Sequence, residues 1–204
     1  MKVFIVEGNI GAGKSTFLTN IKKHNEDIIV VYEPVDEWYL TKDKDGMDIF
    51  SYFYSDPKKF AFLFQMNVLS SRLKTIQDAC SKHPNSTIIF ERSIMTDKYI
   101  FMTTLFESGT ISSMEYQIFE SMYQSVYNLL SLKIDGIIYL QCEPFIAYNR
   151  ILQRNRNGEC VSESYLQLLH KQHEKWLLNN SEYSVTVIRS DTVIDYNKLG
   201  KILS

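Results

Sequence analysis

The residues best suited to chemistry lie near the amino terminus, where glycines, a lysine and two hydroxyl side chains occur in a fixed spacing. Residues 8–16 fit the pattern G-x-x-x-x-G-K followed by Ser or Thr: Gly8, Asn9, Ile10, Gly11, Ala12, Gly13, Lys14, Ser15 and Thr16. Glycines let backbone N–H groups surround phosphate oxygens, and a following helix adds partial positive charge. Lys14 would reach the β- and γ-phosphates, and the Ser15 hydroxyl would bind Mg²⁺. This segment predicts a binding site for a nucleoside triphosphate.

Carboxylates follow two short apolar segments farther along the chain. Glu33 comes after residues 28–32, and near a triphosphate it is either a general base for an acceptor hydroxyl or a solvated acid. Glu91 comes after residues 87–90, where an acid can complete the coordination of Mg²⁺. The next residue, Arg92, would orient a carboxylate or a phosphate, unless Glu91 and Arg92 form only a surface pair.

Three arginines, Arg150, Arg154 and Arg156, lead from a predicted helix into an Asn-Gly turn. A guanidinium group stays charged and can bind phosphate through two N–H groups at once. The segment predicts an arginine-rich lid, at about residues 154–162, that would stabilise charge on a transferred phosphoryl group. The alternative is the solvated cationic end of a helix.

Two predicted helices carry side chains that could line a binding pocket. The side chains are Gln65, Val68, Arg72, Asp97 and Phe101. The first three lie on one stripe of an apolar helix at residues 57–81, and the last two lie one turn apart on the next helix. The stripe either lines a pocket for a planar polar ligand or is an exposed strip between two buried faces.

Alternating strands and helices must position these residues. Short runs rich in Val, Ile and Phe predict strands at residues 3–6, 28–32, 87–90, 136–140 and 185–188. Helical periodicity predicts helices at residues 15–24, 57–81, 93–108, 112–132, 143–155 and 162–179. The alternation predicts an α/β fold of three layers, with a five-stranded parallel sheet covered by helices on both faces. In such sheets ligands bind beyond the carboxyl ends of the strands.

Composition excludes several classes of function. The chain has 22 Lys and Arg against 24 Asp and Glu, a formal charge of −2 and a pI near 6.1, which argues against nucleic acid and anionic membranes as partners. No apolar run approaches the roughly 18 residues of a membrane span. Three scattered cysteines without a C-x-x-C pattern fit a reduced, intracellular protein. We therefore expect one cytoplasmic domain over residues 1–204.

Two weaker patterns have simpler interpretations. His170 and His173 lie three residues apart on a polar helix without a third ligand, so we expect a solvated face and no metal site. Residues 43–46 read D-x-x-G, as in GTPases, but the chain has no N-K-x-D, so this segment is interpreted as a loop.

Taken together, these residues resemble the deoxynucleoside kinase family, which contains deoxycytidine, deoxyguanosine and insect-type deoxyribonucleoside kinases. The resemblance rests on EGNIGAGKST at residues 7–16, EPV followed by Trp38, the series Tyr54, Gln65 and Arg72, ERSIMTDKYIF at residues 91–101, GIIYL at residues 136–140, the RNRNGE lid, and YLQLLHKQHEKWL at residues 165–177. It covers roughly residues 3–178. It implies a P-loop kinase fold and phosphorylation of 2′-deoxyribonucleosides at the 5′-hydroxyl for nucleotide salvage, with ATP or another triphosphate as donor and Mg²⁺.

The resemblance also implies roles in catalysis. Glu33 would accept the proton from the 5′-hydroxyl and would be held by Arg92. The phosphates would be bound by Lys14, Arg154 and Arg156, and Mg²⁺ by Ser15 and Glu91; Arg150 is a further candidate from the arginine-rich segment itself. Positioning and charge neutralisation would then carry most of the catalysis.

Other roles concern the nucleoside. By the resemblance, Trp38 and Phe101 would pack on the base, and Gln65 would form hydrogen bonds with its edge. Tyr54 and Glu159 would hold the 3′-hydroxyl, which favours 2′-deoxyribose. The family is typically dimeric, and a homodimer would use the helices at residues 57–81 and 112–132.

Base preference is expected to depend on Arg72 and Asp97, which match the deoxycytidine and deoxypurine branch of the family. An aspartate can accept a hydrogen bond from an exocyclic amine, whereas thymine would present an oxygen to it. Val68 matches the thymidine-using branch, so the predicted pocket is mixed. We expect deoxycytidine, deoxypurines or both to be favoured over thymidine.

Two other functions remain as alternatives. A nucleoside monophosphate kinase of the thymidylate type shares the phosphate loop and the arginine lid, but ERS at residues 91–93 and Glu33 speak against it. A nucleotide-binding switch without an acceptor is disfavoured because N-K-x-D is missing and Tyr54, Gln65 and Glu159 would have no purpose.

Overall fold

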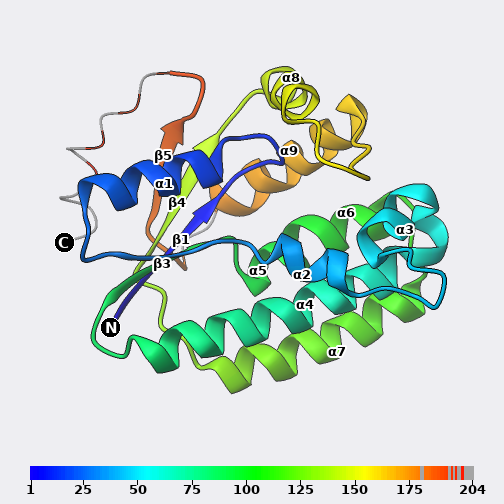
Figure 1. The fold of residues 1–204 in the computed structure, drawn as a ribbon, viewed down its shortest axis with the longest axis horizontal. Helices are drawn as coiled ribbons and strands as arrows, with labels where there is room; N and C mark the ends of the chain where they lie inside the picture. Colours follow the sequence, from blue (N-terminus) through cyan, green and yellow to red (C-terminus); the bar gives the residue numbers. More distant parts are fainter. Residues whose placement is uncertain (180–181, 193, 195, 197–198, 200–204) are drawn as a thin grey trace.

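The computed structural model describes residues 1–179, 182–192, 194, 196 and 199. Its centre is a parallel sheet of β1 (Lys2–Glu7), β2 (Ile29–Val31), β3 (Thr87–Glu91), β4 (Gly136–Gln141) and β5 (Val185–Arg189) in the order β2-β3-β1-β4-β5 (Figure 1). The five predicted strands are confirmed, with ends that differ by one or two residues.

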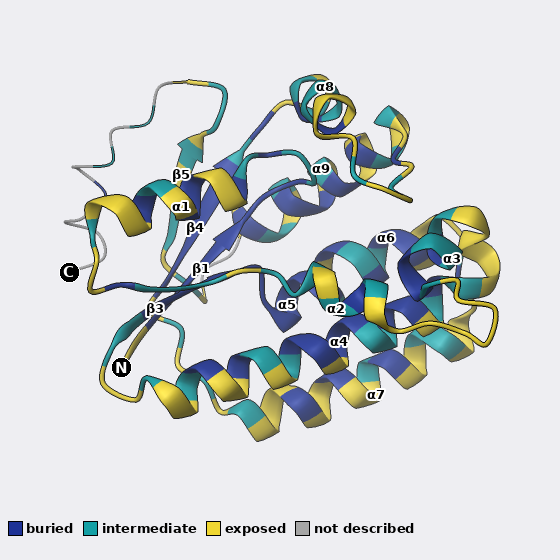
Figure 2. Ribbon diagram, viewed as in Figure 1, coloured by how far each residue is buried: buried dark blue, intermediate teal, exposed yellow. Residues whose placement is uncertain are grey.

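Side chains of the central strand alternate between the two faces of the sheet. Phe4 and Val6 of β1 pack with Phe17, Leu18 and other residues of α1 (Lys14–His24) in one apolar cluster. On the other face, Val3 belongs to the cluster around α4 (Pro57–Lys82), and Ile5 packs near α9 (Glu163–Leu177). Since both faces are covered, the inner strands β1, β3 and β4 are largely buried, whereas the edge strands β2 and β5 are partly exposed (Figure 2). The three-layer α/β fold expected from the sequence is confirmed.

The remaining helices surround the carboxyl ends of the strands and the far side of α4. They are α2 (Val35–Leu40), α3 (Ile49–Ser55), α5 (Ile94–Thr96), the π-helix η1 (Asp97–Met102), α6 (Thr103–Glu107), α7 (Ser113–Leu130) and α8 (Pro144–Arg154). Helices α4 and α7 lie side by side (Figure 1). Within the described residues, no helix combines the length and the apolar character needed to cross a membrane.

Several helices begin where local chemistry predicts. Asp56 caps α4 by accepting a hydrogen bond from the Lys59 N–H, and Pro57 occupies the first helical turn. Ser112 and Glu115 form a reciprocal capping box at the start of α7. Residues 43–46 form a turn, as expected, in which Asp43 accepts hydrogen bonds from two backbone N–H groups.

Two parts of the helical prediction need correction. The single helix expected at residues 93–108 is divided into α5, η1 and α6, because a π-helical stretch interrupts it. Such stretches are frequent at functional sites. Helices α2 and α3 were not predicted because they are too short for a helical period to be recognised. They matter here because their aromatic side chains pack against α4.

Candidate active site

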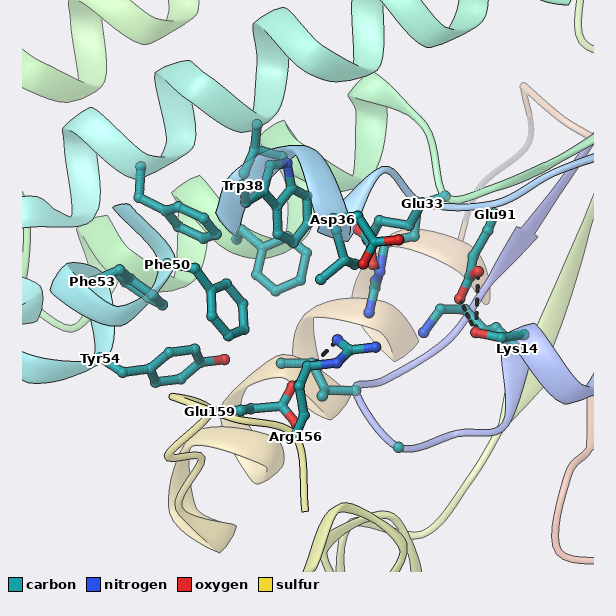
Figure 3. Close-up of a pocket in the computed structure, with 18 of the residues that line it drawn as sticks. Lys14, Glu33, Asp36, Trp38, Phe50, Phe53, Tyr54, Glu91, Arg156 and Glu159 are labelled. Carbon is teal, nitrogen blue, oxygen red and sulfur yellow. Dashed lines mark hydrogen bonds and ion pairs between the residues drawn. The ribbon is translucent and has the colours of Figure 1, made fainter. Parts of the chain in front are cut away.

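A cavity of about 250 Å³ lies beyond the carboxyl ends of β1, β2 and β3, between the phosphate loop and the helices α2, α3 and α4 (Figure 3). Most of the predicted site residues line it: Ile10, Gly11, Lys14, Ser15, Glu33, Trp38, Tyr54, Gln65, Val68, Glu91, Arg92, Phe101, Arg154, Arg156 and Glu159. The structure therefore brings together residues that are up to 149 positions apart in the chain.

The phosphate loop connects β1 to α1 in a conformation that requires glycine. Gly11 has a φ of +79°, and a Cβ at this position would lie 2.4 Å from the Ala147 carbonyl oxygen. Gly13, at the N-cap of α1, has no side chain to occupy the free N–H groups of the first helical turn. Asn9 fixes the loop from outside by donating from Nδ2 to the Leu166 carbonyl at 2.9 Å. The loop therefore offers backbone donors to an anion.

Lys14 points into this loop from the start of α1. Its Nζ donates to the carbonyl oxygens of Gly8 at 3.1 Å and Asn9 at 2.9 Å, and the residue is only 5% exposed. Burial, followed by the positive charge of Arg92, lowers the pKa of Lys14 to about 7. A bound phosphate would favour the protonated form because it adds negative charge nearby.

Glu33 lies between two buried arginines. Its Oε1 accepts a hydrogen bond from Arg72 Nη2 at 2.9 Å and lies 3.4 Å from Arg92 Nε. Burial would raise the pKa of Glu33, but the positive charges of Arg92, Arg72 and Lys14 outweigh it and hold this pKa at about 2. Glu33 is therefore an ionised, oriented carboxylate that faces the cavity at neutral pH.

Arg72 also forms an ion pair with Asp97 behind the wall of the cavity. Arg72 Nε lies 2.9 and 3.2 Å from the two carboxylate oxygens of Asp97, and Asp97 is fully buried in η1. Burial raises the pKa of Asp97 to about 6, although Arg72 opposes this shift. Neither residue lines the cavity. In this structure Asp97 is therefore not in a position to make the direct contact with a base that was expected from the sequence.

Ser15 and Glu91 lie next to each other where the phosphate loop faces the end of β3. Ser15 Oγ is 2.9 and 3.1 Å from the two carboxylate oxygens of Glu91 (Figure 3). A hydroxyl and a carboxylate are the oxygen ligands that Mg²⁺ accepts beside phosphates and water. Within the described residues, no group of three or more His, Cys, Asp or Glu side chains could hold a metal ion. The hydroxyl of Ser15 and the carboxylate of Glu91 are oxygen donors of the type that fits Mg²⁺.

Aromatic rings form the apolar end of the cavity. Trp38 meets Phe64 edge-on at 5.3 Å between ring centroids, and its Nε1 donates to Ser71 Oγ at 3.0 Å. Gln65 projects into this apolar end, where its Oε1 is buried without a hydrogen-bond partner among the described residues. A planar ligand with polar edges would fit this combination, since rings would cover its faces and the amide could bind its edge.

A second polar group lies on the lid side of the cavity. The carboxylate of Glu159 is bound by Arg154 Nη2 at 2.5 Å and lies 3.8 Å from Arg156 Nη1. Figure 3 shows the Tyr54 hydroxyl pointing toward Glu159. Burial, followed by the charge of Glu159, raises the pKa of Tyr54 well above its usual value, so the hydroxyl keeps its proton. The two groups together offer a donor and an acceptor to one hydroxyl of a ligand.

The lid closes onto α2 and α3 through its backbone. Tyr39 donates from its hydroxyl to the Asn157 carbonyl at 2.7 Å. Gly158 has a φ of +74°, and a Cβ there would lie 2.8 Å from Ser51 Oγ. The close approach of the lid to α3 therefore depends on glycine at this position.

A second groove, of about 760 Å³, lies on the other side of the phosphate loop. Arg150 lines it and donates from Nη1 to the Ala12 carbonyl at 3.3 Å and from Nη2 to the Ser190 carbonyl at 2.9 Å. Arg150 therefore links the phosphate loop to the segment after β5. Ser190 and Thr192, in the segment after β5, also line this groove.

The cavity and the groove meet at one place. Six residues line both: Gly11, Lys14, Ser15, Glu91, Arg154 and Arg156. These residues carry the phosphate-loop lysine, the candidate magnesium ligands and two lid arginines. A triphosphate in the groove would therefore present its terminal phosphate to a ligand in the cavity.

Some residues that line the cavity were missed by the sequence analysis. The cavity is also lined by Tyr32, Val35, Asp36, Phe50, Phe53, Phe64 and Tyr165. Phe64 adjoins the predicted Gln65, and Asp48, which caps α3 by accepting from the Ser51 N–H, was a usable signal for the helix that supplies Phe50 and Phe53.

The expectation that His173 lies on a solvated face was wrong. His173 is 1% exposed, its ring stacks on Tyr139 at 5.9 Å, and its Nδ1 lies 2.7 Å from the Leu169 carbonyl. Burial lowers the pKa of His173 well below its usual value, so this ring is neutral. Its polar neighbours in the sequence concealed that the residue occupies the inner face of α9.

Comparison with known proteins agrees with this geometry. The deoxynucleoside kinase family profile matches residues 4–203. The chain is 39% identical to a probable deoxycytidine kinase of fowlpox virus, over all of this chain and 86% of that protein. It is 35% identical to human deoxycytidine kinase, over 89% of this chain and 77% of that protein. It is 33% identical to a mitochondrial deoxyguanosine kinase of Xenopus laevis, over 87% and 73%.

An aromatic cavity that adjoins a phosphate loop is compatible with a kinase of this kind. The sequence-based assignment is thereby confirmed. The chain belongs to the deoxynucleoside kinase family, a family of phosphotransferases that act on deoxynucleosides.

Proposed function

We propose that this enzyme transfers the γ-phosphoryl group of ATP to the 5′-hydroxyl of deoxycytidine, deoxypurine nucleosides or both, in preference to thymidine. The observation that carries the proposal is the junction of the aromatic cavity with the phosphate-loop groove, which is lined by Lys14, Ser15 and Glu91. A nucleoside in the cavity would direct its 5′-hydroxyl toward this junction. A triphosphate in the groove would direct its γ-phosphate toward the same point.

Glu33 is the proposed general base. Its carboxylate faces the cavity, is 15% exposed and is oriented by Arg72 and Arg92. A base with a pKa of about 2 is ionised throughout the neutral range and can accept a proton as the oxygen–phosphorus bond forms. Arg92 would hold both the general base Glu33 and the transferred phosphoryl group in line.

Lys14 and the lid arginines are the proposed phosphate ligands. Lys14 would bind the β- and γ-phosphates, and Arg154 and Arg156 would neutralise charge that spreads over the transferred group. Ser15 and Glu91 would hold Mg²⁺, which supplies further neutralisation of the phosphate charge when bound. Because Arg150 is bonded to the Ala12 and Ser190 carbonyls, we propose that it supports the loop and the donor groove beside any phosphate contact.

Selection of the sugar would depend on Tyr54 and Glu159. The Tyr54 hydroxyl can donate to a 3′-hydroxyl, and the Glu159 carboxylate, fixed by Arg154, can accept from it. The lid would thus join recognition of the sugar to closure over the phosphates, because Arg154 and Glu159 belong to the same segment.

Selection of the base would depend on Gln65 and on the charged pair behind it. Cytosine and adenine present an exocyclic amine that could donate a hydrogen bond to Gln65 Oε1, which has no partner among the described residues. The Asp97 carboxylate does not line the cavity, but it holds Arg72, which in turn donates to Glu33 in the wall. Three relatives are named as kinases of deoxycytidine or deoxyguanosine, which supports the same preference.

A homodimer through α4 and α7 is the proposed assembly. Large apolar side chains remain exposed on these neighbouring helices, namely Leu63 on α4 and Met114, Ile118, Met122 and Leu129 on α7. The α7 residues recur at helical spacing on one face. Light scattering of the purified protein tests this assembly, with twice the chain mass of 23.9 kDa expected. A mass of one chain at micromolar concentration would contradict it.

The function is tested by measuring kcat/KM for the four deoxynucleosides with ATP and Mg²⁺, and by offering dTMP and dCMP as acceptors. Deoxycytidine or a deoxypurine nucleoside should have the highest kcat/KM, and neither monophosphate should be phosphorylated. Thymidine as the best substrate would refute the proposed preference. Efficient use of dTMP would instead favour a monophosphate kinase.

A further inference from the structure

A buried carboxylate beside the site has no role in the proposed mechanism. Glu7 is the last residue of β1, adjoins the phosphate loop and is fully buried. Its Oε1 accepts hydrogen bonds from Thr96 Oγ1 at 2.5 Å and from Ser93 Oγ at 3.2 Å. Glu7 does not line the cavity, so it would not touch a nucleoside there. Its partners, however, both belong to the turn that follows Arg92.

This turn has an unusual backbone. Arg92 has a φ of +66°, in the left-handed region that residues with a side chain rarely adopt. Such a conformation persists only where the surroundings determine it several times over. Here the Arg92 N–H donates to the Val6 carbonyl at 3.0 Å, and the Ser93 N–H donates to Thr96 Oγ1 at 3.0 Å. Thr96 Oγ1 thus connects the backbone directly after Arg92 to the Glu7 carboxylate.

The Arg92 side chain itself is buried but makes few polar contacts. Its Nε lies 3.4 Å from Glu33 Oε1, and its guanidinium stacks on Phe101 at 5.0 Å. Nε and Nη1 are buried and have no hydrogen-bond partner among the described residues. Since few hydrogen bonds fix the guanidinium, its direction depends on the backbone from which it leaves as well as on its packing against Phe101.

We infer that Glu7 and Thr96 are positioning residues, which hold the left-handed turn at Arg92 and so aim its guanidinium at Glu33 and the transferred phosphoryl group. The inference rests on the proposed roles of Arg92 and Glu33. Burial raises the pKa of Glu7 to about 7, so its carboxyl is partly protonated near neutral pH. The feature that matters is therefore the acceptor oxygen Oε1, more than a full negative charge.

Paired substitutions separate the hydrogen bonds from the packing. Thr96→Val removes the connecting hydroxyl with little change of shape and should lower kcat about tenfold, whereas Thr96→Ser should stay within about twofold of the original enzyme. Glu7→Met removes the acceptor and should match Thr96→Val, whereas Glu7→Gln keeps it and should stay within about threefold. Thr104→Val, which removes a buried hydroxyl without a described partner, is the control and should leave kcat unchanged.

A double-mutant cycle with Arg92→Lys distinguishes positioning from a general loss of structure. If Thr96 acts through Arg92, Thr96→Val should lower kcat no further in the Arg92→Lys background, while its effect on Tm persists. Equal losses of kcat in both backgrounds would overturn the inference. So would unchanged kcat for Thr96→Val in the original enzyme, and this result would leave the proposed function standing. Unchanged kcat for Arg92→Lys alone would overturn both the inference and the proposed role of Arg92.

Discussion

Replacing Glu33 with Gln tests the proposed base with little change of shape. The amide oxygen can still accept the hydrogen bond that Arg72 Nη2 makes at 2.9 Å, but the side chain can no longer take up a proton. Arg72 keeps its second partner, Asp97, whereas Arg92 loses the one carboxylate with which it forms an ion pair in the described structure. The substitution should therefore impair catalysis far more than folding.

The size of the loss follows from the chemistry of a general base. Such a base contributes about 10²–10⁴-fold to a rate, which corresponds to roughly 3–5 kcal/mol of activation free energy at about 1.36 kcal/mol for each factor of ten. The stability of Glu33→Gln should fall by about 1–3 kcal/mol, because a buried guanidinium loses a charged partner. Binding of ATP should change far less than kcat does, because Glu33 lies outside the donor groove.

The assay is steady-state turnover of ATP with deoxycytidine, together with direct titration of ATP binding. Glu37→Gln is the matched control, since Glu37 lies on the same segment and forms only an exposed pair with Lys74 at 3.6 Å. This control should keep the original kcat. An unchanged kcat for Glu33→Gln would refute Glu33 as the general base. A loss of ATP affinity as large as the loss of kcat would refute the separation of the cavity from the donor groove.

Three other predictions concern the phosphate loop, the lid and the sugar. Burial and Arg92 lower the pKa of Lys14 to about 7, and a triphosphate binds the protonated form. The affinity for ATP should therefore fall by up to about tenfold for each pH unit above 7. ATP titrations at pH 6–9 measure this, and an affinity that does not change with pH would contradict it. Gly158→Ala should raise the KM for deoxycytidine about tenfold, because a Cβ would lie 2.8 Å from Ser51 Oγ. Gly109 also has a positive φ, of +68°, but open space around it, so Gly109→Ala is the control and should leave KM unchanged. Tyr54→Phe should lower kcat/KM for deoxycytidine about three- to tenfold through one lost hydrogen bond, and an equal loss with 2′,3′-dideoxycytidine would refute the contact to the 3′-hydroxyl.

The sequence was sufficient for the parts of the site that local chemistry determines. The phosphate loop needs glycines at fixed positions, and the carboxylates Glu33 and Glu91 follow strands whose apolar runs are unmistakable. Because parallel strands bring their carboxyl ends to one edge, the sequence order of these residues already implied their proximity in space.

The parts that could not be predicted depend on contacts between distant segments. The rings of Phe50 and Phe53 enter the cavity because α3 packs on α4, and nothing within residues 49–55 indicates that direction. Arg72 and Asp97 were expected in the wall, but their mutual ion pair lies behind it. His173 was misread for a related reason, since its burial depends on Tyr139 of a distant strand.

The central claim is that the cavity binds a neutral deoxynucleoside and delivers its 5′-hydroxyl to the triphosphate. Phosphorus NMR of a reaction with deoxycytidine, ATP and Mg²⁺ tests this most directly, because it identifies the acceptor atom and counts the products. We expect one deoxycytidine 5′-monophosphate for each ADP formed, with negligible ATP turnover when the nucleoside is omitted. Phosphate on another hydroxyl, or ATP hydrolysis that does not require the nucleoside, would contradict it.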